Sequence, residues 1–216
     1  MNCCQSPQCR GIEETFSEEV AKDELEHFLR HGPARQTRKL IEIFQREDLP
    51  SLTLLDIGGG VGAIQHALGE GRVGRVVNVD ASTAYSRTAQ TEAERRGYRS
   101  RAEYHIGDFV LLAGEIDSAD LVSLDRVICC YPDIRGLVKA AAGKTRKLVG
   151  TVYPVYTWYF RFGVQVINFF QILRRASFRV YAHPSVLVES LFAEAGFRRG
   201  HYQKGLLWQV AVFEKM

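Results

Sequence analysis

Short apolar runs alternate with longer amphipathic stretches through the middle of the chain. The runs "LTLLDI" (52–57), "RVVNVD" (75–80) and "AEYHIGD" (102–108) predict strands, and "TAYSRTAQTEAERRG" (83–97) between them predicts a helix. Such alternation is typical of βαβ units, which build a mostly parallel sheet with helices on both faces. Because ligands of these sheets bind at the carboxyl ends of the strands, we expect the functional residues there.

The alternation continues and then changes near the C-terminus. "DLVSLDRVIC" (120–129) and "KLVGTVYP" (147–154) predict two more strands, and "HPSVLVESLFAEAGF" predicts a helix with Pro184 at its first position. The last stretch, 198–215, predicts two strands whose connection is too short for a parallel pair. We therefore expect an α/β fold with a Rossmann-like, doubly wound, seven-stranded mixed sheet that ends in an antiparallel C-terminal hairpin.

Before this sheet, the first forty or so residues predict helices. The segment "TFSEEVAKDELEHFL" (15–29) begins with a capping box from Thr15 to Glu18, and a Gly-Pro pair follows its end. We expect residues 1–216 to form one domain, in which 1–34 are a helical N-terminal extension.

The composition agrees with one globular unit. A chain of 216 residues with 46% hydrophobic content can bury a substantial core in a single domain. The formal net charge of +3 comes from 28 basic residues scattered among 25 acidic ones, a mixture that does not indicate a nucleic acid partner. The N-terminal residues lack the pattern of a secretory signal, so we expect a cytoplasmic protein.

The cysteines show neither the pattern of a metal site nor that of a disulfide framework. Their number is odd and they contain no CxxC pair. In a cytoplasmic setting we expect mostly reduced thiols, and we assign no metal. The five are Cys3, Cys4, Cys9, Cys129 and Cys130.

The stretch "LLDIGGGVG" (54–62) is the first candidate for a binding site. Four glycines behind a strand let a ligand approach the backbone closely, at an entropic cost that an ordinary turn does not require. A P-loop is excluded because no Lys followed by Ser or Thr closes the loop. A nicotinamide dinucleotide site remains open, since Gly58, Gly60 and Ala63 fit G-x-G-x-x-A and Asp80 follows about 20 residues on.

Two acidic residues favour a different nucleoside ligand. Asp56 stands two residues before the glycine loop, where a carboxylate would oppose a pyrophosphate but would suit an ammonium group. Asp108, in "IGDF" after the third predicted strand, can accept a hydrogen bond from an adenine amino group.

Taken in order and spacing, "LLDIGGGVG", "VVNVDAS" and "HIGDF" resemble the first three motifs of the class I S-adenosylmethionine-dependent methyltransferases. The resemblance covers roughly residues 35–216. It implies that S-adenosylmethionine is the cofactor and S-adenosylhomocysteine the product, with Asp56 and the glycine loop at the methionine part, Asp80 at the ribose hydroxyls and Asp108 at the adenine. The implied cofactor-binding residues are Asp56, Gly58, Gly59, Gly60, Gly62, Asp80, Ala81, Ser82, Gly107, Asp108, Phe109, Asp125 and Arg126.

Methyl transfer from a sulfonium is an in-line displacement, so the protein mainly aligns the acceptor with the methyl group. A general base is needed only if the acceptor must lose a proton. In the family, the segment after the fourth strand passes the methyl group; here it is "SLDRVICCYPD", which contains Cys129 and Tyr131. We take Tyr131 and His183 as the candidate catalytic residues. Packing roles stay open for Cys129 and Tyr131, and a capping or surface role stays open for His183.

The stretch 153–183 is unusually aromatic and apolar, with four arginines. Because a helix that is apolar on nearly every face is buried or covers an apolar ligand, we expect a substrate lid insertion. A homodimer interface and a membrane-surface contact through 162–173 remain alternatives, although that segment is too short to span a bilayer.

The layout and the Tyr131-Pro132 pair are faintly similar to the magnesium-protoporphyrin O-methyltransferases. We therefore expect an O-directed methyltransferase of a hydrophobic or aromatic small molecule. The alternatives are an NAD(P)-dependent oxidoreductase and a protein that binds S-adenosylmethionine without catalysis.

Overall fold

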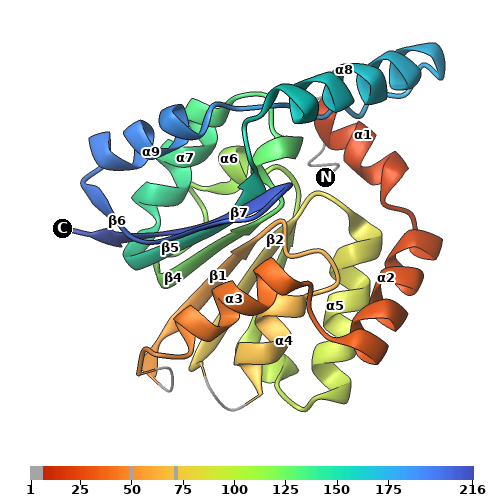
Figure 1. The fold of residues 1–216 in the computed structure, drawn as a ribbon. Helices are drawn as coiled ribbons and strands as arrows, with labels where there is room; N and C mark the ends of the chain where they lie inside the picture. The colour runs from red at the N-terminus through yellow and green to blue at the C-terminus, as the bar shows by residue number, and fades with distance from the viewer. Residues whose placement is uncertain (1–6, 49–50, 71–72) are drawn as a thin grey trace.

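The structure, a computed structural model, describes residues 7–48, 51–70 and 73–216. Its strands form one mixed sheet in the order β3-β2-β1-β4-β5-β7-β6 (Figure 1). The first five strands pair in parallel, and β7 pairs antiparallel with both β5 and β6. The seven-stranded mixed sheet with its antiparallel C-terminal hairpin is therefore confirmed. The strands are β1 Thr53–Ile57, β2 Arg75–Asp80, β3 Ala102–Ile106, β4 Ala119–Asp125, β5 Thr145–Pro154, β6 Phe197–Lys204 and β7 Trp208–Lys215.

Helices cover both faces of this sheet. Figure 1 shows α6, α7 and α9 on one face and α3, α4 and α5 on the other, while α1 and α2 run along one side. The α-helices are α1 Pro7–Thr15, α2 Glu18–His31, α3 Arg35–Phe44, α4 Ala63–Gly69, α5 Thr83–Arg95, α6 Phe109–Leu112, α7 Ile134–Gly143, α8 Trp158–Leu173 and α9 Ser185–Glu194. Two short 3₁₀ helices, η2 Arg99–Arg101 and η3 Ile128–Cys130, complete the described elements.

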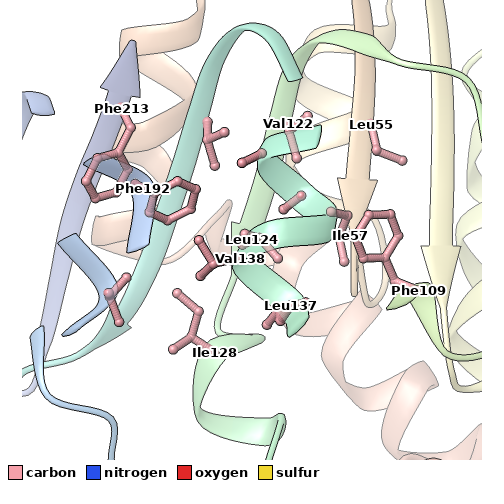
Figure 2. Packing of buried hydrophobic residues seen from close by; sticks show 14 of the residues in the cluster. Leu55, Ile57, Phe109, Val122, Leu124, Ile128, Leu137, Val138, Phe192 and Phe213 are labelled. Atoms are coloured by element: carbon pink, nitrogen blue, oxygen red, sulfur yellow. The ribbon is translucent and has the colours of Figure 1, made fainter. Parts of the chain in front are cut away.

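Two hydrophobic cores flank the sheet because successive strand residues point to opposite faces. Leu54 of β1 packs with the cluster under α3 and α4, whereas Leu55 and Ile57 pack with the cluster under α7 and α9. Figure 2 shows the second cluster, in which Phe192 of α9 lies beside Phe213 of β7. Both cores fix the central strands, whose carboxyl ends carry the candidate site.

Several predicted boundaries differ from the observed ones. The predicted capping box does not form, because Thr15 ends α1 and Ser17 caps α2 instead, accepting the backbone N–H of Val20. Pro184 is the N-cap of α9 rather than its first helical residue. Ser17 directly precedes α2, whose first backbone N–H groups have no partner within the helix, so its side-chain oxygen can accept one of them. Thr15 is the last residue of α1 and is not in that position.

The fourth strand is shorter than predicted. It ends at Asp125, and the "RVIC" that follows turns into η3. Arg126 has a φ of 62°, a left-handed conformation that stops the strand. Its backbone N–H still donates to Val152 of β5 at 2.8 Å. The turn brings η3 and Tyr131 over the end of the sheet.

The helix α8 differs most from expectation. Its sequence predicts a buried helix or a lid, yet Val164 is its one buried residue. Most of its apolar side chains are exposed, among them Trp158, Phe162 and Leu173. No residue of α8 lies among the described lining residues of the cavity discussed below. Of the two possibilities that its apolar sequence allows, a buried helix is thus ruled out, and the lid stays a prediction.

The cysteines also depart from the expected reduced state. Cys9 is disulfide-bonded, whereas Cys129 and Cys130 are free thiols. Cys3 and Cys4 lie outside the described residues, so the structure does not test their role.

Among residues 7–48, 51–70 and 73–216, no three His, Cys, Asp or Glu side chains form a group able to hold a metal ion. Within the same ranges, no helix has the length and apolarity needed to cross a bilayer.

Candidate functional site

A cavity of about 720 Å³ lies at the carboxyl ends of the parallel strands. The loops after β1, β2, β3 and β4 form one wall, and α1 and α2 form the opposite wall. Most of the residues singled out from the sequence line it, although they come from distant parts of the chain. These are Asp56, Gly58, Gly59, Gly60, Asp80, Ala81, Gly107, Asp108, Phe109, Asp125, Arg126, Cys129 and Tyr131.

The glycine loop between β1 and α4 presents bare backbone to the cavity. Gly58, Gly60 and Gly62 have φ values of 60°, 57° and 90°, in the left-handed region that glycine adopts without strain. A Cβ at Gly58 would lie 2.5 Å from a methyl group of Val127, so a side chain there would force the loop out of place. The loop geometry thus requires glycine and leaves room for a ligand against the main chain.

Asp80 ends β2 and ties it to the glycine loop. One of its carboxylate oxygens accepts the backbone N–H of Gly60 at 2.9 Å, and the other accepts that of Ser82 at 2.8 Å. Burial raises the pKa of Asp80 to about 6, against these two hydrogen bonds, which lower it. The carboxylate is therefore held in a fixed orientation at the cavity wall and is mostly ionised at neutral pH.

Asp56 is a buried carboxylate at the end of β1. Its Oδ1 accepts the hydroxyl of Ser123 at 2.6 Å, while its Oδ2 has no hydrogen-bond partner among the described residues. Burial raises the pKa of Asp56 to about 7, although the bond from Ser123 lowers it. A buried carboxylate oxygen without a partner is costly unless a cation approaches it. Asp56 therefore fits the ammonium group that its position in the sequence suggested.

Asp108 and Tyr131 meet across the cavity, although 23 residues separate them in the chain. The Tyr131 hydroxyl donates to Oδ1 of Asp108 at 2.8 Å, and the same oxygen accepts the backbone N–H of Val110 as the cap of α6. Burial raises the pKa of Tyr131 above its usual range, so its hydroxyl stays protonated at neutral pH. Phe109 is buried beside this pair and lines the cavity.

Asp125 and Arg126 lie where β4 ends. The hydroxyl of Thr37 in α3 donates to Oδ2 of Asp125 at 2.7 Å, and Oδ1 of Asp125 has no hydrogen-bond partner among the described side and main chains. Burial raises the pKa of Asp125. The guanidinium of Arg126 lies over the ring of Trp208, 5.2 Å from its centroid. Thr37 and Trp208 also line the cavity, and nothing in their local sequence pointed to it.

Three candidates are not among the described lining residues of the cavity: Gly62, Ser82 and His183. Gly62 and Ser82 are the N-caps of α4 and α5, so they position the loops rather than face the ligand space. His183 lies behind Tyr131, with its Nε2 at 2.9 Å from the Tyr131 carbonyl oxygen. Burial lowers the pKa of His183, which is therefore neutral at pH 7.

The wall formed by α1 and α2 was missed by the sequence analysis. Phe16, Glu24 and Phe28 line the cavity from this side. Periodicity identified helices here and apolar positions on them, but it could not show which surface these helices cover. The N-terminal extension closes the cavity that the sheet leaves open.

Specific contacts hold α1 in place. The side-chain amide of Gln8 donates to the carbonyl oxygens of Cys130 at 2.5 Å and Arg179 at 3.1 Å. The backbone of α1 at Gly11 approaches Phe178 so closely that a Cβ would collide with its main chain. These contacts join the N-terminal helix to η3 and to the segment that follows α8.

The cavity wall is strongly acidic. Arg126 is the one Lys or Arg among its described lining residues, against several carboxylates. Even with raised pKa values at some of these acids, the balance favours a ligand with positive charge. The lining carboxylates are Asp23, Glu24, Asp56, Asp80, Asp108 and Asp125.

Sequence comparison agrees with this site. Residues 55–147, which span the glycine loop and the strand ends, match the family described as methyltransferase domain. No curated protein matches the chain in sequence.

Solved structures share the fold at low sequence identity. The magnesium protoporphyrin IX methyltransferase of Synechocystis, with bound S-adenosylhomocysteine, is 15% identical with a TM-score of 0.74, over 97% of this chain and all of that one. An O-methyltransferase family 2 protein of Planctomyces limnophilus, in complex with apigenin, is 18% identical with a TM-score of 0.65, over 92% of this chain and 62% of that one.

Human N-acetylserotonin methyltransferase in complex with S-adenosylmethionine is 18% identical with a TM-score of 0.61, over 92% of this chain and 56% of that chain. The nicotinamide alternative receives no support from these comparisons. Residues 55–147 therefore match a methyltransferase domain, and the chain has the fold of solved S-adenosylmethionine-dependent methyltransferases.

Proposed function

We propose that the protein is a methyltransferase that uses S-adenosylmethionine as cofactor and acts on an oxygen atom of a hydrophobic or aromatic small molecule. The observation that supports this most is that the cavity combines an acidic region with an apolar region. Acidic residues gather at the strand ends, whereas Phe16, Phe28 and Val127 contribute apolar surface. A volume of about 720 Å³ lies within the usual range of small-molecule sites.

The proposed cofactor contacts are those that the resemblance implies, and the geometry of the strand ends supports them. Asp56, with its unpartnered Oδ2, and the glycine loop would hold the methionine part. Asp80 would accept the ribose hydroxyls, and Asp108 with Phe109 would hold the adenine. Bound there, the cofactor supplies an electrophilic methyl group on a sulfonium. The protein's own task is to hold the acceptor in line with that methyl group.

Tyr131 and His183 have different proposed roles. Tyr131 is a protonated donor fixed on Asp108, so it would orient a ligand rather than remove a proton. His183 is neutral, and donation from its Nε2 to the Tyr131 carbonyl would leave Nδ1 to accept a proton. A phenolic acceptor would need this base, whereas a carboxylate acceptor would not.

The insertion 153–183 has a proposed supporting role in the same site. Its helix α8 does not reach the described lining of the cavity, but the segment after α8 does contact the cavity wall. Phe178 packs edge-on against Phe16 of the α1–α2 connection, and the backbone N–H of Tyr181 donates to Cys129. We assign this segment to the acceptor side of the single domain, with residues 1–34 as the extension that closes it.

A methyl-transfer assay tests the proposal. The protein is incubated with methyl-labelled S-adenosylmethionine and a panel of apolar phenols, apolar aromatic carboxylates including magnesium protoporphyrin IX, and matched amines. We expect label in an O-methyl ether or ester; mild alkali releases labelled methanol from an ester only. Label on amines alone would contradict O-direction, and cofactor binding without transfer to any acceptor would favour a non-catalytic binding protein.

A further inference from the structure

The helix α8 carries a continuous apolar stripe that points away from the protein. Trp158, Phe162, Val166, Phe169 and Leu173 recur at spacings of three or four residues and therefore share one face. Trp158, Phe162 and Leu173 are exposed by 77%, 62% and 62%. Val164, the buried residue of the helix, lies on the opposite side. Figure 1 shows α8 along the top of the molecule, with its C-terminal end extending past α1.

Basic side chains flank this stripe. Residues 155–188 contain four arginines and no Asp or Glu. At about 100° per residue, Arg161 lies on one side of the stripe and Arg174 on the other, with Arg175 at the end of the helix. These three arginines are exposed and form no ion pair with any described residue. Their charge is therefore available to an anionic surface.

The exposed apolar surface continues beyond α8. The Tyr159 hydroxyl donates to the carbonyl oxygen of Leu206 at 2.8 Å, which places the β6–β7 turn beside the start of the helix. Leu206 and Leu207 of this turn are exposed, and Lys204 next to them adds another positive charge. An apolar patch of this extent, rimmed by basic groups, is typical of an interaction site.

We propose that α8 and the β6–β7 turn dock on an anionic phospholipid bilayer. The helix has 16 residues and is about 24 Å long, so it lies along the interface rather than across the hydrocarbon, which is about 30 Å thick. The stripe enters the boundary between head groups and acyl chains, and the arginines contact lipid phosphates. This inference depends on α8 and the β6–β7 turn, and not on the acceptor of the reaction.

A second copy of the chain fits this surface less well. Two-fold pairing of α8 with α8 in antiparallel orientation brings Arg161 of one copy toward Arg174 and Arg175 of the other. Because residues 155–188 contain no acidic residue, nothing in this segment compensates the repulsion. An anionic membrane satisfies both the apolar stripe and the charge.

Vesicle sedimentation tests the proposal. The protein, residues 1–216, is mixed with phosphatidylcholine vesicles, with or without phosphatidylglycerol. We expect binding to the anionic vesicles that weakens as salt is raised. Phe162→Glu/Phe169→Glu should abolish binding, and Arg174→Gln/Arg175→Gln should weaken it by about fivefold per arginine removed. The matched control, Leu29→Glu/Leu111→Glu, changes two exposed leucines outside α8 and should bind like the unmodified protein.

Binding of S-adenosylhomocysteine checks that each variant folds. If Phe162→Glu/Phe169→Glu does not fold, the proposal is tested by the arginine variant and by the salt dependence of binding. The proposal is overturned if the anionic vesicles sediment no protein, or if the control loses binding equally. It is also overturned if light scattering shows a dimer that Phe162→Glu/Phe169→Glu dissociates, because a second copy then covers α8.

Discussion

At the scale of single residues, the site contains carboxylates in positions that are unfavourable for folding. Asp56 and Asp80 are buried, and burial raises the pKa of both. A cationic ligand with hydroxyl groups supplies the positive charge and the hydrogen-bond donors that the protein itself does not offer to these carboxylates. Such a ligand explains why the two side chains are buried. Stability and binding therefore oppose each other at these two positions.

The first prediction concerns Asp56→Asn in the cofactor-free protein. The folded-state pKa of Asp56, about 7, lies above the ordinary aspartate value of 3.8, so folding favours the protonated form. The stability contribution of Asp56 is present below about pH 4 and is lost as pH rises to about 7. We expect Asp56→Asn to raise the free energy of unfolding by about 2 to 4 kcal/mol at pH 8 and hardly at all at pH 4.

Denaturant unfolding at the two pH values measures this difference. Asp117→Asn is the matched control, because Asp117 is an exposed carboxylate that is not among the described lining residues of the cavity and pairs with Arg75 at the surface. An Asp56→Asn protein that is equally stabilised at both pH values would show that the charge of Asp56 is not the cause.

The second prediction concerns Asp80→Asn. Loss of the negative charge should weaken binding of S-adenosylhomocysteine by about 1 to 3 kcal/mol, the scale of a hydrogen bond to a charged group. Isothermal titration calorimetry measures the dissociation constant, with Asp117→Asn again as the control. Unchanged affinity in Asp80→Asn would remove Asp80 from the ribose site.

At the scale of elements, the N-terminal helices control the access of ligands to the cavity. α1 and α2 form one wall of it, and α1 is held by the close approach of Gly11 to Phe178 and by the bonds of Gln8. The sequence predicted these helices but not their docking, because periodicity gives the apolar face and not its partner. The same limit explains why the sequence of α8 left a lid, a dimer interface and a membrane surface as alternatives.

The third prediction uses Gly11→Ala. Its Cβ would collide with the main chain of Phe178, so α1 must move away from the cavity. We expect about tenfold faster dissociation of S-adenosylhomocysteine, corresponding to an overpacking cost within the usual 1 to 3 kcal/mol. Stopped-flow displacement measures the rate. Gly163→Ala in α8 is the control, since a Cβ there meets nothing within 4 Å; equal rates for the two variants would contradict a closing role for α1.

At the scale of the whole molecule, the mixed seven-stranded sheet and the direction of its strands followed from the sequence, whereas the strand order came from the structure. The alternation of apolar runs and helices predicted the parallel part, and the short connection before Trp208 predicted the antiparallel hairpin. The site could be located for the same reason, since the carboxyl ends of β1 to β4 must meet at one edge. What the sequence could not give were contacts between distant segments, such as Thr37 with Asp125 and Tyr131 with Asp108.

The fourth prediction is that ligand binding stabilises the whole domain. Since the cavity joins the N-terminal helices to the sheet, S-adenosylhomocysteine at 100 times its dissociation constant should add about 2.7 kcal/mol to the free energy of unfolding. A thermal shift titration with S-adenosylhomocysteine, and with NAD as the control ligand, measures the effect. A larger shift with NAD would contradict the assigned cofactor.

The cavity at the strand ends is proposed to hold the cofactor on the carboxylates of Asp56 and Asp80, and the other assignments at the site depend on this. A crystal structure of the protein with S-adenosylhomocysteine tests it directly. We predict the ribose hydroxyls within hydrogen-bond distance of Asp80 and the amino group of the ligand next to Asp56. A ligand found elsewhere, or one whose ribose leaves Asp80 without contact, would contradict the account.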